Sequence, residues 1–112
     1  MSNTPLHLHL VSDSTGETVH QIARACLAQF PEVRATEHVW TLVRSDTHVE
    51  AVINGVDRNP GIMLMSIVDP DLRTLIETRC NERHIPHISV LDPVVNMLGN
   101  LLGQPMQSRP GG

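Results

Sequence analysis

The residues best suited to chemistry lie between Val11 and Thr18, where the chain reads VSDSTGET. Hydroxyl groups, a flexible glycine and the unpaired N–H groups of a helix that begins there could bind a phosphate or carboxylate, because the helix dipole adds partial positive charge. The candidate anion-binding residues are Ser12, Ser14, Thr15, Gly16 and Thr18. The stretch from Ser14 to Glu17 also spells a capping box, whose side chains would satisfy the same N–H groups internally. Both interpretations stand on the sequence.

Charged residues accompany this segment. Asp13 would repel an anion unless it orients a hydroxyl, binds a metal or acts as a base, so we include it in the candidate site. Asp46, Asp69 and Asp92 also closely follow apolar runs, and we interpret these three as helix N-caps rather than as a carboxylate ring for Mg²⁺. Arg44 completes the candidate set, because its guanidinium could hold a phosphate or carboxylate. The alternative for Arg44 is a solvated surface arginine.

Histidine and cysteine side chains are common metal ligands, but their spacing in this chain does not indicate a metal site. His7 and His9 share one face of an expected strand, about 7 Å apart at Cα, which suits two metal ligands. No further ligand is indicated, so hydrogen-bonded core histidines are the favoured interpretation. Cys26 and Cys80 lack a CxxC or Cys/His spacing, which predicts buried thiols rather than a disulfide or zinc site. We expect no structural metal.

The elements that must position these residues follow from hydrophobic patterning. Short apolar runs alternate with segments of helical period, which predicts βα units and a parallel sheet. The expected strands are Leu6–Val11, His38–Val43, Ile62–Val68 and Ile85–Leu91. The first helix has an apolar stripe of Val19, Ile22, Ala23, Cys26, Leu27 and Phe30, and the last has one of Val94, Val95, Leu98, Leu101 and Leu102.

Strand composition also predicts the strand order. The run at 62–68 is the most apolar and belongs in the centre of the sheet, whereas Pro86 cannot donate to a ladder and places its strand at an edge. We therefore expect order 2-1-3-4, with helices on both faces, in a Rossmann-like or flavodoxin-like α/β fold. Such a sheet opens a ligand crevice at the carboxyl ends of its first and third strands.

Composition narrows the functional classes. The chain has 112 residues, 40% of them hydrophobic, and a net charge of −4, which fits one globular domain over residues 1–102 and a Gly/Pro-rich linker over 103–112. All its basic residues are arginines, so it lacks both a basic stripe for nucleic acid and the lysine of a Walker A loop. Neither a signal peptide nor a membrane span is evident, which predicts a cytoplasmic protein.

Five segments in order suggest a family: LHLHLVSDSTGET, EHVW followed by LVR, PGIMLMSIVDPDLR, ISVLDPV and SRPGG. Together they resemble the amino-terminal part of the kinase-pyrophosphorylase family, the bacterial and plant regulatory proteins of pyruvate phosphate dikinase and phosphoenolpyruvate synthase. The resemblance implies ADP-dependent phosphorylation of a target threonine, and phosphate-dependent removal of that phosphoryl group with release of pyrophosphate.

The same resemblance implies that phosphoryl transfer takes place in another domain of the protein. In the family the nucleotide loop, of the type G-V-S-R-x-x-K-T-P, belongs to a carboxyl-terminal domain, so this domain would have no catalytic residues and no cofactor of its own. We expect it to be inactive alone. The resemblance implies the target enzyme and the protein's own carboxyl-terminal domain as partners. The sequence leaves a homodimer open, and its composition indicates neither nucleic acid nor a membrane as a partner.

Two alternatives remain on the sequence. A stand-alone flavodoxin-like domain could bind an anion or FMN through Gly16 and Thr18, although Phe30 and Trp40 are the only aromatic residues available for stacking on a flavin. A structural dimerisation module would instead associate through the last apolar helix.

Overall fold

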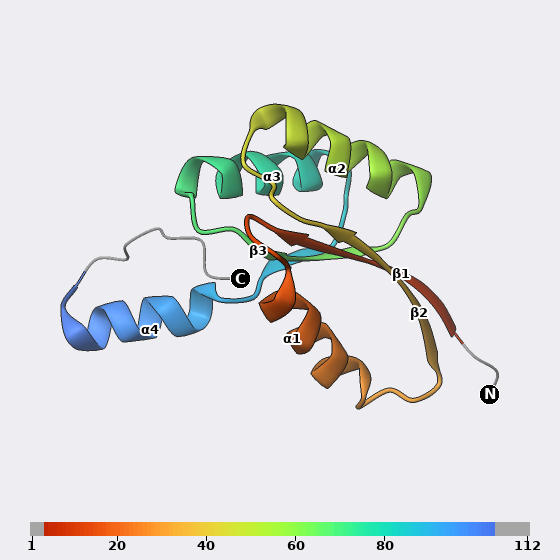
Figure 1. Cartoon of the computed structure of the whole chain (residues 1–112), viewed down its shortest axis with the longest axis horizontal. Coiled ribbons are helices and arrows are strands. Elements are labelled where there is room, and N and C mark those ends of the chain that lie inside the picture. The colour runs from red at the N-terminus through yellow and green to blue at the C-terminus, as the bar shows by residue number, and fades with distance from the viewer. Residues whose placement is uncertain (1–3, 105–112) are drawn as a thin grey trace.

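A computed structural model describes residues 4–104 of the chain, in which strands and helices alternate (Figure 1). The elements are β1 (Thr4–Ser12), α1 (Glu17–Leu27), β2 (Val33–Trp40), α2 (Asp46–Arg58), β3 (Ile62–Ser66), α3 (Pro70–Glu82), β4 (His87–Ser89) and α4 (Asp92–Leu102). Within these residues the strands form one parallel four-stranded sheet in the order β2-β1-β3-β4. The predicted α/β class and strand order are confirmed. Most of the expected linker, residues 105–112, lies outside the described residues.

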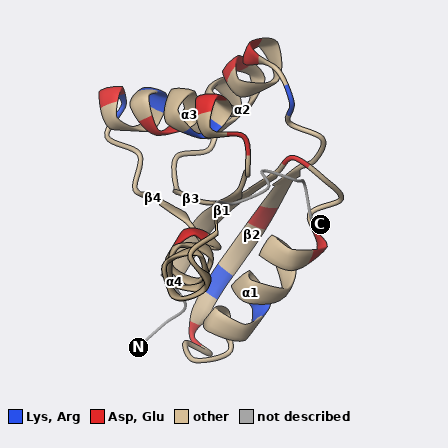
Figure 2. Cartoon of the chain, turned by 90° about the vertical axis from the view of Figure 1, so that its left-hand side faces the viewer, with Lys and Arg blue, Asp and Glu red and all other residues tan. Residues whose placement is uncertain are grey.

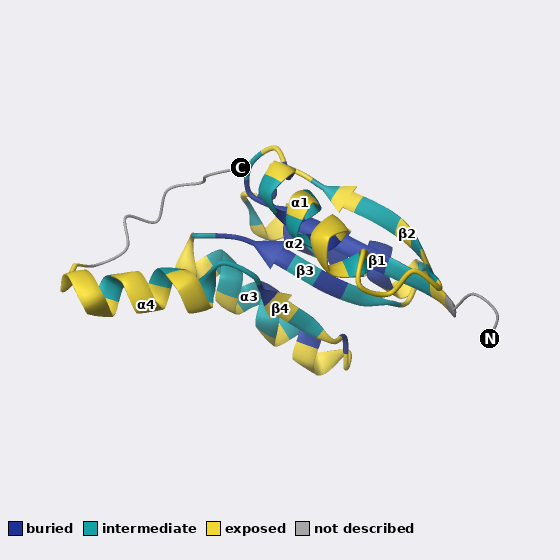
Figure 3. Cartoon of the chain, turned by 90° about the horizontal axis from the view of Figure 1, so that it is seen from below, coloured by how far each residue is buried: buried dark blue, intermediate teal, exposed yellow. Residues whose placement is uncertain are grey.

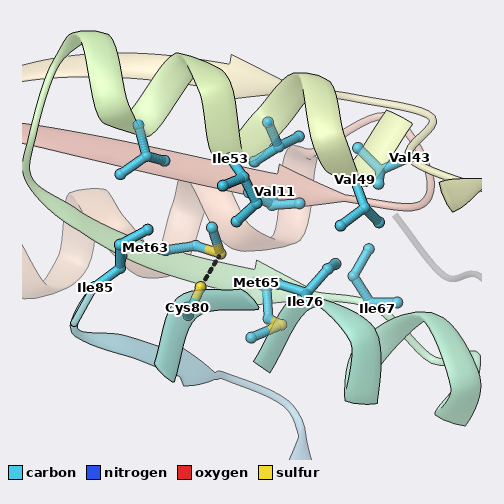
Figure 4. Close-up of a cluster of buried hydrophobic side chains, with 12 residues drawn as sticks. Val11, Val43, Val49, Ile53, Met63, Met65, Ile67, Ile76, Cys80 and Ile85 are labelled. Atoms are coloured by element: carbon cyan, nitrogen blue, oxygen red, sulfur yellow. Dashed lines mark hydrogen bonds between the residues drawn. The ribbon is translucent and has the colours of Figure 1, made fainter. Parts of the chain in front are cut away.

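The two faces of the sheet are covered unequally. Helices α2 and α3 lie together on one face, and α1 lies on the other (Figure 1). Alternate residues of β1 therefore enter different cores: Val11 packs with residues of α2 and α3, whereas Leu8 and Leu10 pack with α1. Figure 4 shows the larger core, in which Cys80 of α3 donates to the sulfur of Met63 at 3.8 Å.

The two cysteines differ in environment. Cys80 is fully buried as predicted, and this burial raises the pKa of its thiol to about 11. Cys26 is exposed, so its predicted burial is wrong. It lies near the end of α1, next to a part of the sheet that this helix does not cover.

Helix α4 stands away from the sheet (Figures 1 and 3). None of its eleven residues, all of which the structure describes, is buried. The apolar stripe predicted for this helix is present but exposed. Among the helices within residues 4–104, none has the length and hydropathy needed to cross a membrane.

The predicted bounds of the edge strands are wrong. Strand β2 runs from Val33 to Trp40, not from His38 to Val43, because Leu42 adopts a positive φ of 54° that a strand does not allow. The polar first half of β2 was missed because an edge strand does not need a continuous apolar run. Strand β4 is limited to His87–Ser89, directly after Pro86, which agrees with an edge position.

Three aspartates were predicted to cap helices, and the structure confirms one of these caps. Asp69 caps α3 by accepting from the N–H groups of Asp71 and Leu72. Asp46 is not a cap, since Ser45 takes that position and accepts from the N–H of His48. Asp92 is the first residue of α4 and instead lies 3.4 Å from Arg73 of α3. The cap predictions for Asp46 and Asp92 are therefore wrong.

Candidate functional site

The segment from Ser12 to Thr18 lies at the carboxyl edge of the sheet, where β1 ends between β2 and β3. Ser12 is fully buried, and its Oγ accepts from the backbone N–H of Ser14 at 3.0 Å. The carbonyl oxygens of Ser12 and Ser14 accept from the N–H groups of Val43 and Leu42, each at 3.0 Å. These bonds hold the loop against the segment that follows β2.

Helix α1 begins without a side-chain cap. Its N-cap is Gly16, which is buried, has a φ of +88°, and offers no side chain to the first turn. Of the two interpretations of this segment, the capping box from Ser14 to Glu17 is wrong, because Gly16 rather than Ser14 occupies the capping position. Helical hydrogen bonding starts with the N–H of His20 donating to the carbonyl of Gly16. The preceding N–H groups of the first turn lack helical acceptors and remain suited to an anion.

Arg44 reaches this loop from the other side. Its Nε donates to the carbonyl oxygen of Asp13 at 2.8 Å, and its backbone N–H donates to Nδ1 of His48 at 3.1 Å. Arg44 is exposed and forms no ion pair with any residue of the described part of the chain. The positive charge expected near the segment from Ser12 to Thr18 is therefore present.

Asp13 has a structural role that the sequence did not reveal. Its side chain is buried, with the residue only 3% exposed, and Oδ2 accepts from the N–H of Val68 at 2.9 Å. The backbone N–H of Asp13 donates to the carbonyl of Ser66 at 3.3 Å. Asp13 thus links the ends of β1 and β3. Across residues 4–104, no three His, Cys, Asp or Glu side chains group closely enough to hold a metal ion.

The structure brings most of the candidate residues together. Ser12, Asp13, Ser14, Gly16 and Arg44 are joined by the bonds above or adjoin them in sequence. Thr15 is exposed and Thr18 is half-buried in the first turn of α1. Sequence reasoning missed the backbone groups of Leu42, Val43 and Val68 that fix the loop, because backbone contacts between distant segments leave no residue-type signal.

The strand histidines form a cluster on the α2 side of the sheet. Nε2 of the fully buried His9 donates to the carbonyl of Asn59 at 2.9 Å, while its Nδ1 accepts from the indole N–H of Trp40 at 3.2 Å. His7 and His38 share a hydrogen bond of 2.9 Å, and the rings of His9 and His38 stack with centroids 4.6 Å apart. The prediction of hydrogen-bonded core histidines is confirmed for His9.

Burial, followed by the neighbouring His38 and His7, lowers the pKa of His9, against an opposing effect of its hydrogen bond to Asn59. The hydrogen bonds of His9 agree with this lowered pKa, because a ring whose Nε2 donates and whose Nδ1 accepts is a neutral imidazole.

Comparison with known proteins gives consistent matches over nearly the whole chain. A family model described as kinase/pyrophosphorylase matches residues 8–112. Three relatives named as pyruvate, phosphate dikinase regulatory proteins come from Rhizorhabdus wittichii, Rhodospirillum rubrum and Paramagnetospirillum magneticum. They are 46%, 45% and 50% identical over 95%, 99% and 94% of this chain, respectively. These matches cover 39%, 40% and 34% of the relatives, so the chain spans about two fifths of their length or less.

Proposed function

The chain belongs to the kinase/pyrophosphorylase family, and we propose that it is the amino-terminal part of a bifunctional regulatory enzyme acting on a threonine of its target. One activity phosphorylates the target from ADP, and the other removes the phosphoryl group with inorganic phosphate and releases pyrophosphate. The names of the relatives support pyruvate phosphate dikinase as the target class, with phosphoenolpyruvate synthase as the second candidate from the motif resemblance. The proposed location is the cytoplasm.

Within this enzyme, we assign the loop from Ser12 to Thr18 and Arg44 to binding an anionic group, such as a phosphate, the edge of a nucleotide or the active-site loop of the target. The observation that carries this assignment is the uncapped start of α1 at Gly16, adjacent to a loop to which the Arg44 guanidinium is bonded. A helix N-terminus and a guanidinium both favour negative charge, and here they converge on one segment.

Asp13 limits what the site can accept. Its Oδ2 already accepts from Val68, so Oδ1 is the oxygen that could orient a hydroxyl or a metal-bound water. Its negative charge opposes an anion bound at the loop, which makes Arg44 necessary for electrostatic balance.

The flavin alternative receives no support from the positions of the aromatic residues. Trp40 points toward α2, where its indole donates to His9 and lies against Gly55. Phe30 follows the carboxyl end of α1, at the end of that helix opposite to Gly16. Neither ring is available to stack on an isoalloxazine held at the loop from Ser12 to Thr18.

Calorimetric titration of the chain with inorganic phosphate and with ADP tests the assignment of the loop. We expect Arg44→Ala to weaken binding about 10-fold to 100-fold, the range for losing a hydrogen bond to a charged group. Arg24→Ala is the matched control, because Arg24 is exposed in the last turn of α1, far along the helix from Gly16. Equal affinity of the Arg44→Ala variant and the unaltered chain, or no binding of either probe, would contradict the proposed site.

A further inference from the structure

Both ring nitrogens of His9 form hydrogen bonds that require a neutral imidazole. Nε2 donates to the carbonyl of Asn59 at 2.9 Å, and Nδ1 accepts from the indole N–H of Trp40 at 3.2 Å. A proton on Nδ1 would set two N–H groups against each other and would remove the acceptor of the Trp40 indole. The side-chain bond between β1 and β2 at Trp40 therefore exists only while His9 is neutral.

The titratable groups that face His9 oppose its protonation. They are His7 on β1 and His38 on β2, and the ring of His38 stacks on His9 with centroids 4.6 Å apart. From β3, His9 pairs with Met63, and from α2 it meets the carbonyl of Asn59. The buried residues of α2 are uncharged: Val49, Val52, Ile53, Gly55 and Val56.

The charged residues of the four strands lie away from His9. They are Arg34 and Glu37, both on β2 (Figure 2). Glu37 points to the other face of the sheet, where it lies 3.1 Å from His20 of α1. Arg34 is in register with Pro5, four residues before His9. Neither residue compensates a positive charge on the His9 ring.

The indole of Trp40 has little freedom to adjust if this bond is lost. A Cβ added to Gly55 of α2 would lie 2.2 Å from a ring carbon of Trp40, so the helix and the ring are in close contact. Trp40 is also the last residue of β2. Because α2 blocks the ring on one side, losing the bond to His9 displaces the end of this strand.

The segment of residues 41–44, directly after Trp40, holds the loop from Ser12 to Thr18. The N–H groups of Leu42 and Val43 donate to carbonyl oxygens of the loop, each at 3.0 Å. Nε of Arg44 donates to a third carbonyl oxygen of the loop at 2.8 Å. A displacement at the end of β2 therefore acts directly on the candidate anion site.

We propose that His9 is a positioning residue that makes anion binding at this loop sensitive to protons: the neutral ring holds Trp40 and residues 41–44 in place, and protonation releases them. The inference rests on the proposed assignment of the loop to anions. Protonation of His9 and anion binding then weaken each other by the same factor. Simple electrostatics has the opposite sign, because protonating histidines adds positive charge and would tighten the binding of an anion.

Hydrogen exchange of backbone amides tests the release without a ligand. His9→Gln is the comparison, since glutamine does not titrate and offers one donor and one acceptor. At about pH 5, we expect the amides of Leu42 and Val43 to be about 10-fold less protected in the unaltered chain than in the variant, with equal protection at about pH 7. The N–H of Val90, bonded to Met65 beside β3, is the internal control. Unchanged protection of Leu42 and Val43, or an equal loss at Val90, would overturn the inference.

Trp40 gives a second readout because it is the single tryptophan of the chain. Its fluorescence should change between about pH 7 and about pH 5 in the unaltered chain, as its indole loses the bond to His9. In His9→Gln the fluorescence should stay constant over the same range. Constant fluorescence in the unaltered chain would show that acidification does not disturb Trp40, and would overturn the inference without recourse to a variant.

Calorimetric titration with sulfate connects the release to the site, because sulfate, unlike phosphate, keeps its charge over this pH range. The affinity of the unaltered chain should fall about 10-fold from about pH 7 to about pH 5, whereas that of His9→Gln should hold or rise. His84→Asn, at an exposed position, should follow the unaltered chain. An affinity of the unaltered chain that rises on acidification would overturn the inference. Absence of sulfate binding at both pH values, with the expected exchange at Leu42 and Val43, would instead contradict the anion-binding assignment while supporting control of the loop by His9.

Discussion

At the scale of single residues, Asp13 combines a structural bond with a charge at the candidate site. Replacing it with alanine removes the acceptor of the buried Val68 N–H, so we expect the free energy of unfolding to fall by about 1–3 kcal/mol. Asp13→Asn keeps a side-chain oxygen at the same position and should cost clearly less. Urea unfolding followed by circular dichroism measures both. Equal losses in the two variants would show that the bond to Val68 is not what Asp13 contributes.

The same asparagine variant tests the sign of the electrostatics at the loop. Because Asp13→Asn removes a negative charge beside the anion-binding residues while preserving shape, it should tighten the binding of inorganic phosphate. The effect should diminish as ionic strength rises. Glu32→Gln, an exposed change just before β2, is the matched control for altering net charge alone. Weaker phosphate binding by Asp13→Asn would instead indicate that the carboxylate orients a group that binds the ligand.

His9 makes stability depend on pH. Its pKa in the folded chain is lowered from 6.5 by burial, so below pH 6.5 the unfolded chain binds more protons than the folded chain. The free energy of unfolding should therefore decrease as the pH falls from 6.5 toward the folded-state pKa of His9. Thermal melts of the unaltered chain and of His9→Gln, compared across this range, should show a weaker pH dependence in the variant. His84→Asn, at an exposed position outside the cluster, controls for the loss of an imidazole.

The residues of the candidate site could be selected from the sequence, but the hydrogen bonds among them could not be predicted. VSDSTGET and Arg44 could be selected because hydroxyls, glycine and a guanidinium have recognisable chemistry. The choice between an open helix start and a capping box could not be made, because it depends on the left-handed backbone of Gly16 and on where the Ser14 carbonyl finds its donor. That donor, Leu42, is far along the chain and is itself in a positive-φ conformation.

At the scale of elements, α2 approaches the sheet so closely that Gly55 has no room for a side chain. A Cβ there would lie 2.2 Å from a ring carbon of Trp40, whose indole is held by His9. We expect Gly55→Ala to destabilise the chain by about 1–3 kcal/mol through overpacking, although alanine favours helix by about 1 kcal/mol. Asn54→Ala, at the preceding exposed position, should be neutral or stabilising. Urea unfolding distinguishes the two, and a stabilising Gly55→Ala would contradict the tight contact.

The order of the strands was predictable because it depends on composition, whereas their bounds were less so. The apolar run at β3 indicated a central strand with a neighbour on each side, and Pro86 before β4 indicated a strand at the edge of the sheet. In β2 the apolar residues at 39–43 suggested a strand there, yet after Trp40 the chain turns so that Leu42 and Val43 bond the loop after β1. The Val43 side chain is buried in the core beneath α2 and α3, whereas Leu42 is about half exposed, so the apolar residues here do not continue the sheet.

At the scale of the whole molecule, the two sides of the sheet differ in completeness. The side of α2 and α3 has a continuous core that includes Met63, Ile76 and Cys80, and its helices are joined by Arg79 of α3 bonding Glu50 of α2 at 2.6 Å. The side of α1 has the smaller core and an open groove. Sequence periodicity correctly indicated that α4 is amphipathic, but it could not show whether its stripe packs on the same chain. The fold therefore has one face with a continuous core and one face with an open apolar groove.

We expect this chain alone to have no phosphoryl-transfer activity. Phosphoryl transfer depends on positive groups that hold the nucleotide phosphates and stabilise the transferred charge, and their loss lowers rates by orders of magnitude. The chain has no lysine, and Arg44 is the one basic side chain bonded to the candidate loop within residues 4–104. Incubation with pyruvate phosphate dikinase and ADP labelled in its terminal phosphate should therefore leave the target unlabelled, and phosphate should release no pyrophosphate from the phosphorylated target. The full-length Rhodospirillum rubrum relative, run in parallel, provides the comparison for a complete protein. Label transferred by the 112-residue chain above the level without protein would contradict the prediction and place catalytic groups within this α/β domain.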